Sequence, residues 1–288
     1  MQTKDYSENI VDVKKIVEEK KEELKKRISL LKRKKIVPKL AVILANDLDS
    51  SRIYVNNKRK LCKELNVEEV EYILGKDTTT KKVLEIIEKL NNDPTVDGIL
   101  VQLPIFEHLD KERILNAISA KKDVDGFHPL NLGKLVSGQK SLVACTPKGI
   151  EYILDSLKVD IEGKTAVVVG RSIIVGKPIS ALLLNRNATV ITCHSKTHDL
   201  KSYTKMADIL VVAAGSPHLI TKGMVKEGAV VIDVGINRKD KKIIGDVDTK
   251  NVLKKAKYVT PVPGGVGITT VTALVDNLVS IAEERVKK

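Results

Sequence analysis

Tyr54 and Lys58 are the first residues along the chain whose types and spacing favour chemistry. They lie in residues 49–65, an amphipathic stretch that follows a compact apolar run and predicts a helix opened by a serine cap. Residues four apart share one face of a helix, so this face presents an aromatic ring beside an ammonium group. A surface tyrosine next to a solvated lysine has the same spacing, so the pair alone leaves both interpretations open.

Polar side chains also follow later apolar runs. Gln102 ends the apolar run 96–102 just before a proline-containing segment, so it is expected at the end of a strand, where its amide can orient a neighbouring lysine. A solvent-facing strand end is the alternative. Asp123 and Asp125 lie one residue apart on a predicted turn, but no Glu closes an EF-hand loop there. A single carboxylate that accepts two N–H groups from a heterocycle fits this turn better.

A strand, a glycine loop and a helix are predicted over residues 164–184. A β-branched run ends at Gly170, five residues separate it from Gly176, and Pro178 lies in the first turn of the helix. Such a unit sets a ligand phosphate against a helix N-terminus. Neither the G-x-G-x-x-G fingerprint nor the spacing of a P-loop is present, so an ordinary strand-to-helix turn remains open.

The next predicted strand, residues 188–193, favours a dinucleotide. An NAD site places an acidic residue after this strand to bind the ribose 2′-hydroxyl, and this chain has none there. Ser195 lies in that place beside His194 and Lys196, and Arg171 lies in the glycine loop, so the pocket suits a 2′-phosphate. NADP is therefore predicted in preference to NAD. No metal is predicted, because the pair His194 and His198 lacks the Glu of a zinc-protease helix.

The C-terminal half repeats strand and turn. Three successive strands are predicted within residues 209–217, 229–237 and 245–248. They end in glycine or small polar residues, a pattern typical of a doubly wound nucleotide domain. Residues 260–267 form a stiff loop in which Pro263, Gly264 and Gly265 allow close backbone approach to a ligand. A last helix is predicted over residues 270–286.

Composition excludes several classes of protein. At 288 residues the chain exceeds the usual size of one core, so two domains are expected. Much of the net charge of +13 lies in stretches such as 14–35 where Lys and Glu alternate, and two Phe without Trp leave few stacking platforms for nucleic acid. The absence of an apolar run of eighteen residues or an apolar leader argues against a membrane protein or an exported one. Three cysteines without a C-x-x-C pair indicate reduced thiols and a cytoplasmic location.

Together these stretches resemble the bifunctional methylenetetrahydrofolate dehydrogenase/methenyltetrahydrofolate cyclohydrolase (FolD) family. The similarity runs from Leu40 to Asn277. It is carried by the ordered motifs Y-V-N-N-K, D-G-I-L-V-Q-L-P, K-D-V-D-G-F-H-P-L-N, C-T-P-K-G, G-R-S-I-I-V-G-K-P, V-I-D-V-G-I-N, G-D-V-D and P-V-P-G-G-V-G.

The resemblance implies an α/β fold with two domains around a cleft. Residues 1–142 would form a folate-binding catalytic domain, on which residues 268–288 pack back as a returning C-terminal helix. Residues 143–267 would form a Rossmann-like, doubly wound NADP-binding domain. The implied protein is a cytoplasmic homodimer of one-carbon metabolism and purine biosynthesis. It would oxidise 5,10-methylenetetrahydrofolate with NADP and hydrolyse the methenyl product to 10-formyltetrahydrofolate.

The resemblance also implies residue roles. The lysine matching Lys58 is the catalytic group, Tyr54 stacks against the folate, Gln102 positions the lysine, and Asp125 holds the pterin. Further substrate contacts are expected from Pro263, Gly264 and Gly265. Cofactor contacts are expected from Gly170, Arg171, Ser172, Val175, Gly176, Ser195 and Ile236.

The chain departs from the family pattern at two places. The family usually has L-P-L-P where this chain has Leu103-Pro-Ile-Phe106, and P-G-G-V-G-P-M-T where it has Gly267-Ile268-Thr269-Thr270. The second departure is expected near the folate, so it bears on substrate contacts and not on the class of reaction.

The implied chemistry makes different demands on the protein. Oxidation of a methylene between two nitrogens leaves a delocalised cation once hydride has moved to nicotinamide, so alignment is the main requirement. Hydration of that cation needs a proton acceptor for water. Lys58 has Arg52, Arg59 and Lys60 nearby in sequence, and this charge is expected to favour its neutral, basic form.

Overall fold

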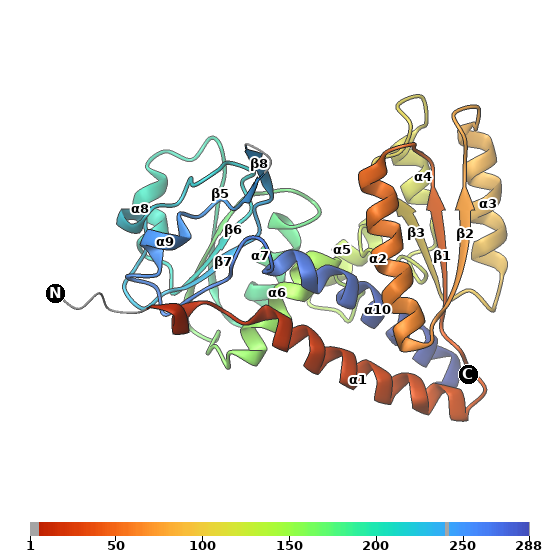
Figure 1. The fold of residues 1–288 in the computed structure, drawn as a ribbon, viewed down its shortest axis with the longest axis horizontal. Helices are drawn as coiled ribbons and strands as arrows, with labels where there is room; N and C mark the ends of the chain where they lie inside the picture. The colour runs from red at the N-terminus through yellow and green to blue at the C-terminus, as the bar shows by residue number, and fades with distance from the viewer. Residues whose placement is uncertain (1–5, 240–241, 288) are drawn as a thin grey trace. The chain divides into compact units, whose positions relative to one another are not determined.

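The fold is taken from a computed structural model that describes residues 6–239 and 242–287 (Figure 1). The described chain divides into two compact units, each with its own parallel sheet. We call the described residues 19–145 and 271–287 the three-strand unit, and the described residues 6–18, 146–239 and 242–270 the five-strand unit. An α/β fold with two domains is therefore confirmed.

The three-strand unit is built on a sheet with the order β2-β1-β3, formed by β1 (Lys39–Leu44), β2 (Glu68–Ile73) and β3 (Gly98–Gln102). β1 is fully buried over residues 40–44, as expected for a central parallel strand covered on both faces. Helix α2 (Asp49–Leu65) follows β1 and α3 (Thr80–Asn92) follows β2. After β3 come α4 (Lys111–Ala117) and α5 (Pro129–Val136).

Two long helices, α1 (Val13–Arg33) and α10 (Val266–Glu284), meet within the three-strand unit. The Arg27 guanidinium on α1 donates to Asp276 and Glu283 on α10, and the short helix η3 (Arg285–Lys287) follows. The predicted return of the C-terminal helix to the N-terminal domain is confirmed. α10 is long and apolar enough to cross a membrane by length and composition alone, but 61% of its apolar window is buried, as in a core helix.

The five-strand unit has the sheet order β10-β7-β6-β4-β5 with every pairing parallel. Its strands are β4 (Thr165–Val169), β5 (Thr189–Cys193), β6 (Ile209–Val212), β7 (Val230–Asp233) and β10 (Tyr258–Val259). A separate antiparallel hairpin joins β8 (Asn237–Lys239) to β9 (Lys242–Ile244). The helical segments are η1 (Ser7–Asn9), α6 (Cys145–Ser156), α7 (Gly176–Asn185), α8 (Leu200–Thr204), η2 (Lys222–Met224) and α9 (Thr249–Val252).

Three local predictions were wrong. Residues 245–248, predicted as a strand, come after β9 and contain only an isolated bridge at Val247. Leu48 is the N-cap residue of α2 and its side chain makes no capping bond; instead its N–H donates to Asn46 Oδ1 at 2.9 Å. The polar cap therefore comes from the loop before the helix. The last helix begins at Val266, not at residue 270, so the end of the predicted glycine loop already forms helical turns.

Candidate active site

The carboxyl ends of β1 and β3 lie side by side and hold the first group of predicted residues. The two strands pair in parallel with Leu44 opposite Gln102. Buried Asn46, just after β1, donates through its side-chain amide to the Pro104 carbonyl, which fixes the two loops against each other. Helix α2 starts from this junction, so its side chains are set beside the end of β3.

Lys58 and Gln102 meet at this junction. Lys58 Nζ donates to Gln102 Oε1 at 2.8 Å, and Gln102 Nε2 donates to the Leu103 carbonyl at 2.8 Å. The second bond orients the amide so that its oxygen faces the lysine. Tyr54, one turn earlier on α2, is 51% exposed and keeps its ring accessible.

Two aspartates of the turn after β3 have different surroundings. Asp123 is buried and accepts from the Gly126 and His128 N–H groups and from Asn131 Nδ2, so its oxygens hold the turn together. Asp125 makes a single described contact, a long one of 3.9 Å from Cys145 Sγ. This distribution leaves Asp125 as the carboxylate with capacity for a ligand.

Burial raises the pKa of the Asp125 carboxyl to about 6, and the Asp123 charge acts in the same direction. The positive charge of Lys58 opposes this rise, so Lys58 lies within electrostatic reach of Asp125. The tyrosine, lysine, glutamine and aspartate predicted from separate stretches therefore gather in one unit.

Arg59 does not contribute the free positive charge expected next to Lys58. Its guanidinium pairs with Glu71 and contacts Glu69, both on β2. Burial, together with the neighbouring Glu71, raises the pKa of Glu69 to about 7. A carboxylate pair on the sheet thus balances this cation.

The glycine loop lies at the carboxyl end of β4 in the five-strand unit. Gly170 has φ +139°, and a Cβ there would lie 2.4 Å from the Ala213 carbonyl oxygen. A Cβ on Gly176 would lie 2.2 Å from the Gly170 carbonyl oxygen. Both glycines therefore allow close approach of backbone that a side chain would prevent, which gives a tight turn from strand to helix.

Residues of the glycine loop differ in exposure and in their hydrogen bonds. Arg171 and Ser172 are exposed, whereas Val175 is buried. Ser172 Oγ accepts from the N–H groups of Val175 at 3.2 Å and Gly176 at 3.4 Å, so it caps the start of α7. Ser172 thus has a structural role that the sequence did not reveal, and the N–H of Val175 is bonded within the loop.

The loop after β5 carries exposed Ser195. The His194 N–H donates to Thr197 Oγ1 at 2.8 Å, and the Lys196 N–H donates to His194 Nδ1 at 3.2 Å. These bonds close a compact turn that holds the serine outward. The first acidic residue after β5 is Asp199, beyond this turn.

The Pro263-Gly-Gly265 loop packs tightly against its own backbone. Pro263 follows a cis peptide bond and is exposed, and a Cβ on Gly265 would lie 2.1 Å from the Pro261 carbonyl oxygen. Thr269, at the departure from the family pattern, is buried and donates to the Val266 carbonyl. It lies against Gly149, where a Cβ would meet its hydroxyl at 1.9 Å. The Thr269 side chain therefore faces the protein interior.

The predicted residues fall into two groups. Tyr54, Lys58, Gln102 and Asp125 belong to the three-strand unit, and the glycine loop, Ser195, Ile236 and the Pro263 loop belong to the five-strand unit. Sequence reasoning missed the structural roles of Asp123 and Asn131, and it gave none to Asp233 and Asp246. Within residues 6–239 and 242–287, no group of three or more His, Cys, Asp or Glu residues is arranged to hold a metal ion.

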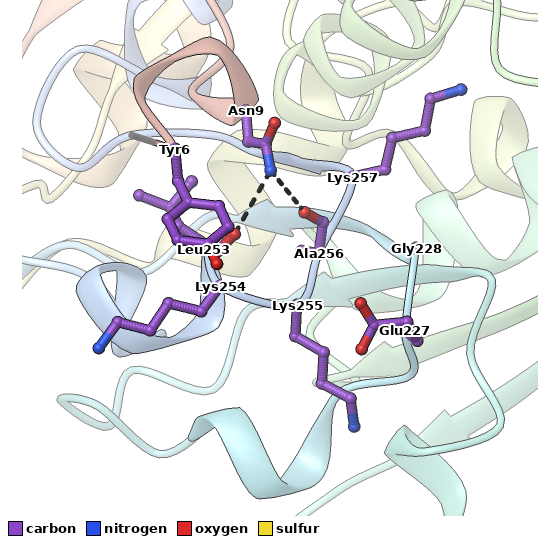
Figure 2. Close-up of a pocket in the computed structure, with 9 residues that line it drawn as sticks. All are labelled: Tyr6, Asn9, Glu227, Gly228, Leu253, Lys254, Lys255, Ala256 and Lys257. Atoms are coloured by element: carbon purple, nitrogen blue, oxygen red, sulfur yellow. Dashed lines mark hydrogen bonds between the residues drawn. The ribbon is translucent and has the colours of Figure 1, made fainter. Parts of the chain in front are cut away.

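A cavity of about 530 Å³ lies away from these residues, at the amino end of the five-stranded sheet (Figure 2). Gly228 precedes β7 and Lys257 precedes β10, and both line it. Asn9 Nδ2 donates across it to the carbonyls of Leu253 at 3.4 Å and Ala256 at 3.0 Å. None of the predicted site residues lines this cavity, so it is separate from the candidate site.

Comparison with known proteins matches both units to one family. The profile described as tetrahydrofolate dehydrogenase/cyclohydrolase, catalytic domain, matches residues 11–125. The NAD(P)-binding domain of the same family matches residues 144–286. "Bifunctional protein FolD" of Campylobacter hominis is 49% identical over 280 residues, which cover 97% of this chain and 99% of that protein.

Solved structures agree. A crystal structure of the bifunctional enzyme FolD-methylenetetrahydrofolate dehydrogenase/cyclohydrolase from Campylobacter jejuni is 47% identical with a TM-score of 0.93, covering 95% of this chain and 98% of that one. The N5,N10-methylenetetrahydrofolate dehydrogenase-cyclohydrolase of Trypanosoma brucei, complexed with NADP cofactor and inhibitor, is 34% identical with a TM-score of 0.91. That match covers 97% of this chain and 98% of the other.

Proposed function

This chain belongs to the tetrahydrofolate dehydrogenase/cyclohydrolase family, and from that premise we propose which of its residues perform the two reactions. It is a bifunctional enzyme of one-carbon metabolism. One activity oxidises 5,10-methylenetetrahydrofolate to the 5,10-methenyl form with a nicotinamide cofactor bound by its NAD(P)-binding domain. The other hydrolyses the methenyl form to 10-formyltetrahydrofolate.

We propose Lys58 as the base of the cyclohydrolase reaction. The single observation that carries this proposal is the 2.8 Å bond from Lys58 Nζ to the oriented oxygen of Gln102. In the role of base, the Lys58 amine donates one N–H to this oxygen and directs its lone pair away from Gln102, where it can take a proton from water. The new C–O bond forms at the methenyl carbon. The bond from that carbon to N5 then breaks, the ammonium returns its proton to the released N5, and the hydroxyl proton leaves to solvent as the formyl C=O forms.

We propose Asp125 as the acceptor for the pterin, with Tyr54 stacking on the folate. The Asp123 oxygens accept hydrogen bonds within the turn, which supports Asp125 as the carboxylate that can accept hydrogen bonds from a ligand. An ionised carboxylate can accept two parallel N–H bonds from a heterocycle. Pro263, Gly264 and Gly265 are proposed as further substrate contacts, made through their backbone.

We propose NADP as the preferred cofactor. The tight turn at Gly170 and Gly176, which a Cβ at either position would block, fits a dinucleotide. The compact, non-acidic turn at Ser195 and the exposed cation of Arg171 suit a 2′-phosphate. Ser172, Val175 and Ile236 complete the proposed set. When bound, the cofactor supplies the hydride acceptor, and the residues of this chain only bind and orient it.

We propose the folate-binding catalytic role for residues 1–142 with 268–288, and the NADP-binding role for 143–267. The division of the site residues between the two compact units supports this assignment. The resemblance also favours a homodimer, and β2 leaves one edge of its sheet for contacts. Three free, buried cysteines favour a cytoplasmic location.

Absorbance assays test the proposal. Methylenetetrahydrofolate is supplied with NADP or with NAD, and methenyltetrahydrofolate is supplied alone. We expect dehydrogenase activity with a lower KM for NADP, and cyclohydrolase activity above the spontaneous rate. A lower KM for NAD would contradict the cofactor assignment and leave the family membership intact.

A further inference from the structure

Two buried aspartates, Asp233 and Asp246, accept hydrogen bonds from the backbone at the carboxyl ends of β6 and β7. Asp246 Oδ2 accepts from the N–H groups of Ala214 at 2.7 Å and Gly215 at 2.9 Å. Asp246 Oδ1 accepts from the Ser216 N–H and from Asn237 Nδ2, both at 2.8 Å. One carboxylate thus holds the whole turn after β6 and the start of the β8-β9 hairpin.

Asp233 holds Asp246 in place. Asp233 Oδ1 accepts from the N–H groups of Gly235 at 2.9 Å and Asp246 at 3.0 Å, and its Oδ2 accepts from the Val247 N–H at 2.9 Å. Its own N–H donates to buried Thr260 Oγ1 at 2.8 Å, which ties in the segment after β10. The two carboxylates therefore join the ends of three strands and the hairpin.

Two glycines make this approach possible. A Cβ on Gly235 would lie 2.3 Å from the Asp246 carboxyl, and a Cβ on Gly245 would lie 1.9 Å from Asp233 Oδ2. Neither distance is compatible with a side chain. Glycine is therefore required at these positions of G-I-N and G-D-V-D, because the two carboxylates pack directly against the backbone there. The two glycines of the sequence motifs are thus the positions at which the carboxylates of the hydrogen-bond network approach the backbone.

This network lies where half of the cofactor is expected. In the sheet order, β5 lies on one side of β4 whereas β6 and β7 lie on the other. A dinucleotide crosses a doubly wound sheet at the point where the strand order reverses. If the 2′-phosphate end lies over Ser195 after β5, the nicotinamide end lies over the turns after β6 and β7.

The network also sets the backbone of Ile236. Gly235 and Asn237, on either side, are bonded to Asp233 and Asp246, while the Ile236 side chain is 57% exposed. The Ile236 side chain reaches to within 3.6 Å of where a Cβ on Gly267 would lie. An exposed apolar side chain on a fixed backbone is suited to pack against a planar ring.

We propose that Asp246, held by Asp233, is a positioning residue for hydride transfer: it fixes the turns 214–216 and 235–237 that set the nicotinamide half of the cofactor. This inference rests on the proposed cofactor site. It assigns no catalytic contact to Asp246, which acts through the backbone that it holds. Cyclohydrolase chemistry at Lys58 does not depend on it.

The test uses Asp246→Asn in the full-length enzyme, with Asp248→Asn as the matched control. An asparagine keeps the size of the side chain but replaces one carboxylate oxygen with an NH₂ group. In the wild type that oxygen accepts from two N–H donors, and an NH₂ group cannot accept from them. Asp248, in the same motif, bonds only Asn251 Nδ2 among the side chains described. Three properties are measured: dehydrogenase kcat, cyclohydrolase rate on methenyltetrahydrofolate, and affinity for adenosine 2′,5′-bisphosphate, which lacks the nicotinamide.

We expect Asp246→Asn to lower dehydrogenase kcat roughly tenfold to hundredfold, the usual effect of misplacing a reacting group. The cyclohydrolase rate and the affinity for adenosine 2′,5′-bisphosphate should stay close to wild type, and Asp248→Asn should behave as wild type throughout. Asn237→Ala removes one donor to Asp246 and should show the same pattern more weakly, so it decides the question if Asp246→Asn does not fold.

Unchanged dehydrogenase kcat, or an equal loss of all three properties in a folded variant, would overturn the proposal. Failure of the wild-type enzyme to bind adenosine 2′,5′-bisphosphate would instead contradict the NADP site itself. The two failures are therefore distinguishable.

Discussion

Replacement of Lys58 by methionine separates the two reactions. Methionine keeps an unbranched stem of similar length but removes both the donor to Gln102 and the proposed proton acceptor. Gln102 is only partly buried, so its oxygen can be solvated after the change and the fold should persist. The expected effect is therefore on rate and not on stability.

The expected loss of cyclohydrolase rate follows from the proposed role of Lys58 as a general base. Loss of a positioned general base lowers a rate by about a hundredfold to ten-thousandfold, which corresponds to about 2.7–5.4 kcal/mol in the barrier. Hydride transfer depends chiefly on alignment, so some dehydrogenase activity should survive. The proposed NADP site belongs to the other unit, so binding of NADP should stay near normal.

The assay supplies methenyltetrahydrofolate directly and follows its decay above the spontaneous rate, which makes the result independent of the dehydrogenase step. Lys60→Met is the matched control, because Lys60 is an exposed lysine on the same helix. Hydrolysis by Lys58→Met at the wild-type rate would remove Lys58 from the mechanism and leave it as a solvated surface lysine.

Three further changes test the other assignments. Asp125→Ala should weaken folate binding by about 1.5–3 kcal/mol in a titration, and unchanged affinity would exclude Asp125 from the pterin site. In the wild type, folate affinity should fall as pH drops through about 6. The pKa of Asp125 is raised to about 6, so below this pH the carboxylate is protonated and loses acceptor capacity. Arg171→Ala should raise the KM for NADP far more than the KM for NAD, and equal effects would refute a 2′-phosphate contact. Arg27→Met should lower the free energy of unfolding by about 1.5–3 kcal/mol in urea, because the buried Asp276 loses the charged hydrogen bond from its guanidinium partner while Lys20 Nζ stays 3.8 Å away; an unchanged value would show that the Arg27–Asp276 pair contributes nothing.

Local sequence was sufficient to predict most of the strands and the polar residues that follow them. Apolar runs mark the strands, because a parallel strand covered on both faces is apolar along its length, as β1 and β4 are. Ligands in such sheets gather at the carboxyl ends of the strands, so the polar residues that follow each run could be named in advance. Residues four apart on one helix, Tyr54 and Lys58, needed only the helical period.

Hydrogen-bond partners were not predictable in the same way. The sequence offers Asp123 and Asp125 one residue apart, and only the folded turn shows that Asp123 holds the backbone while Asp125 keeps free capacity. Ser172 looked like a ligand contact and also caps α7. These roles depend on where neighbouring N–H groups point, which local pattern does not encode.

The sequence by itself determined the apolar strands of this chain, a tight glycine turn at Gly170 and a Tyr54–Lys58 helix face, because these features depend on periodicity and on backbone freedom within a few residues. The family resemblance already implied that Gln102 positions Lys58, and the structure adds the bond between them, 44 residues apart. Tertiary structure alone decided that Asp246 holds a turn about 30 residues earlier. The physical reason is that a buried polar group must find a partner somewhere, and the packing of the strands decides which partner lies within reach.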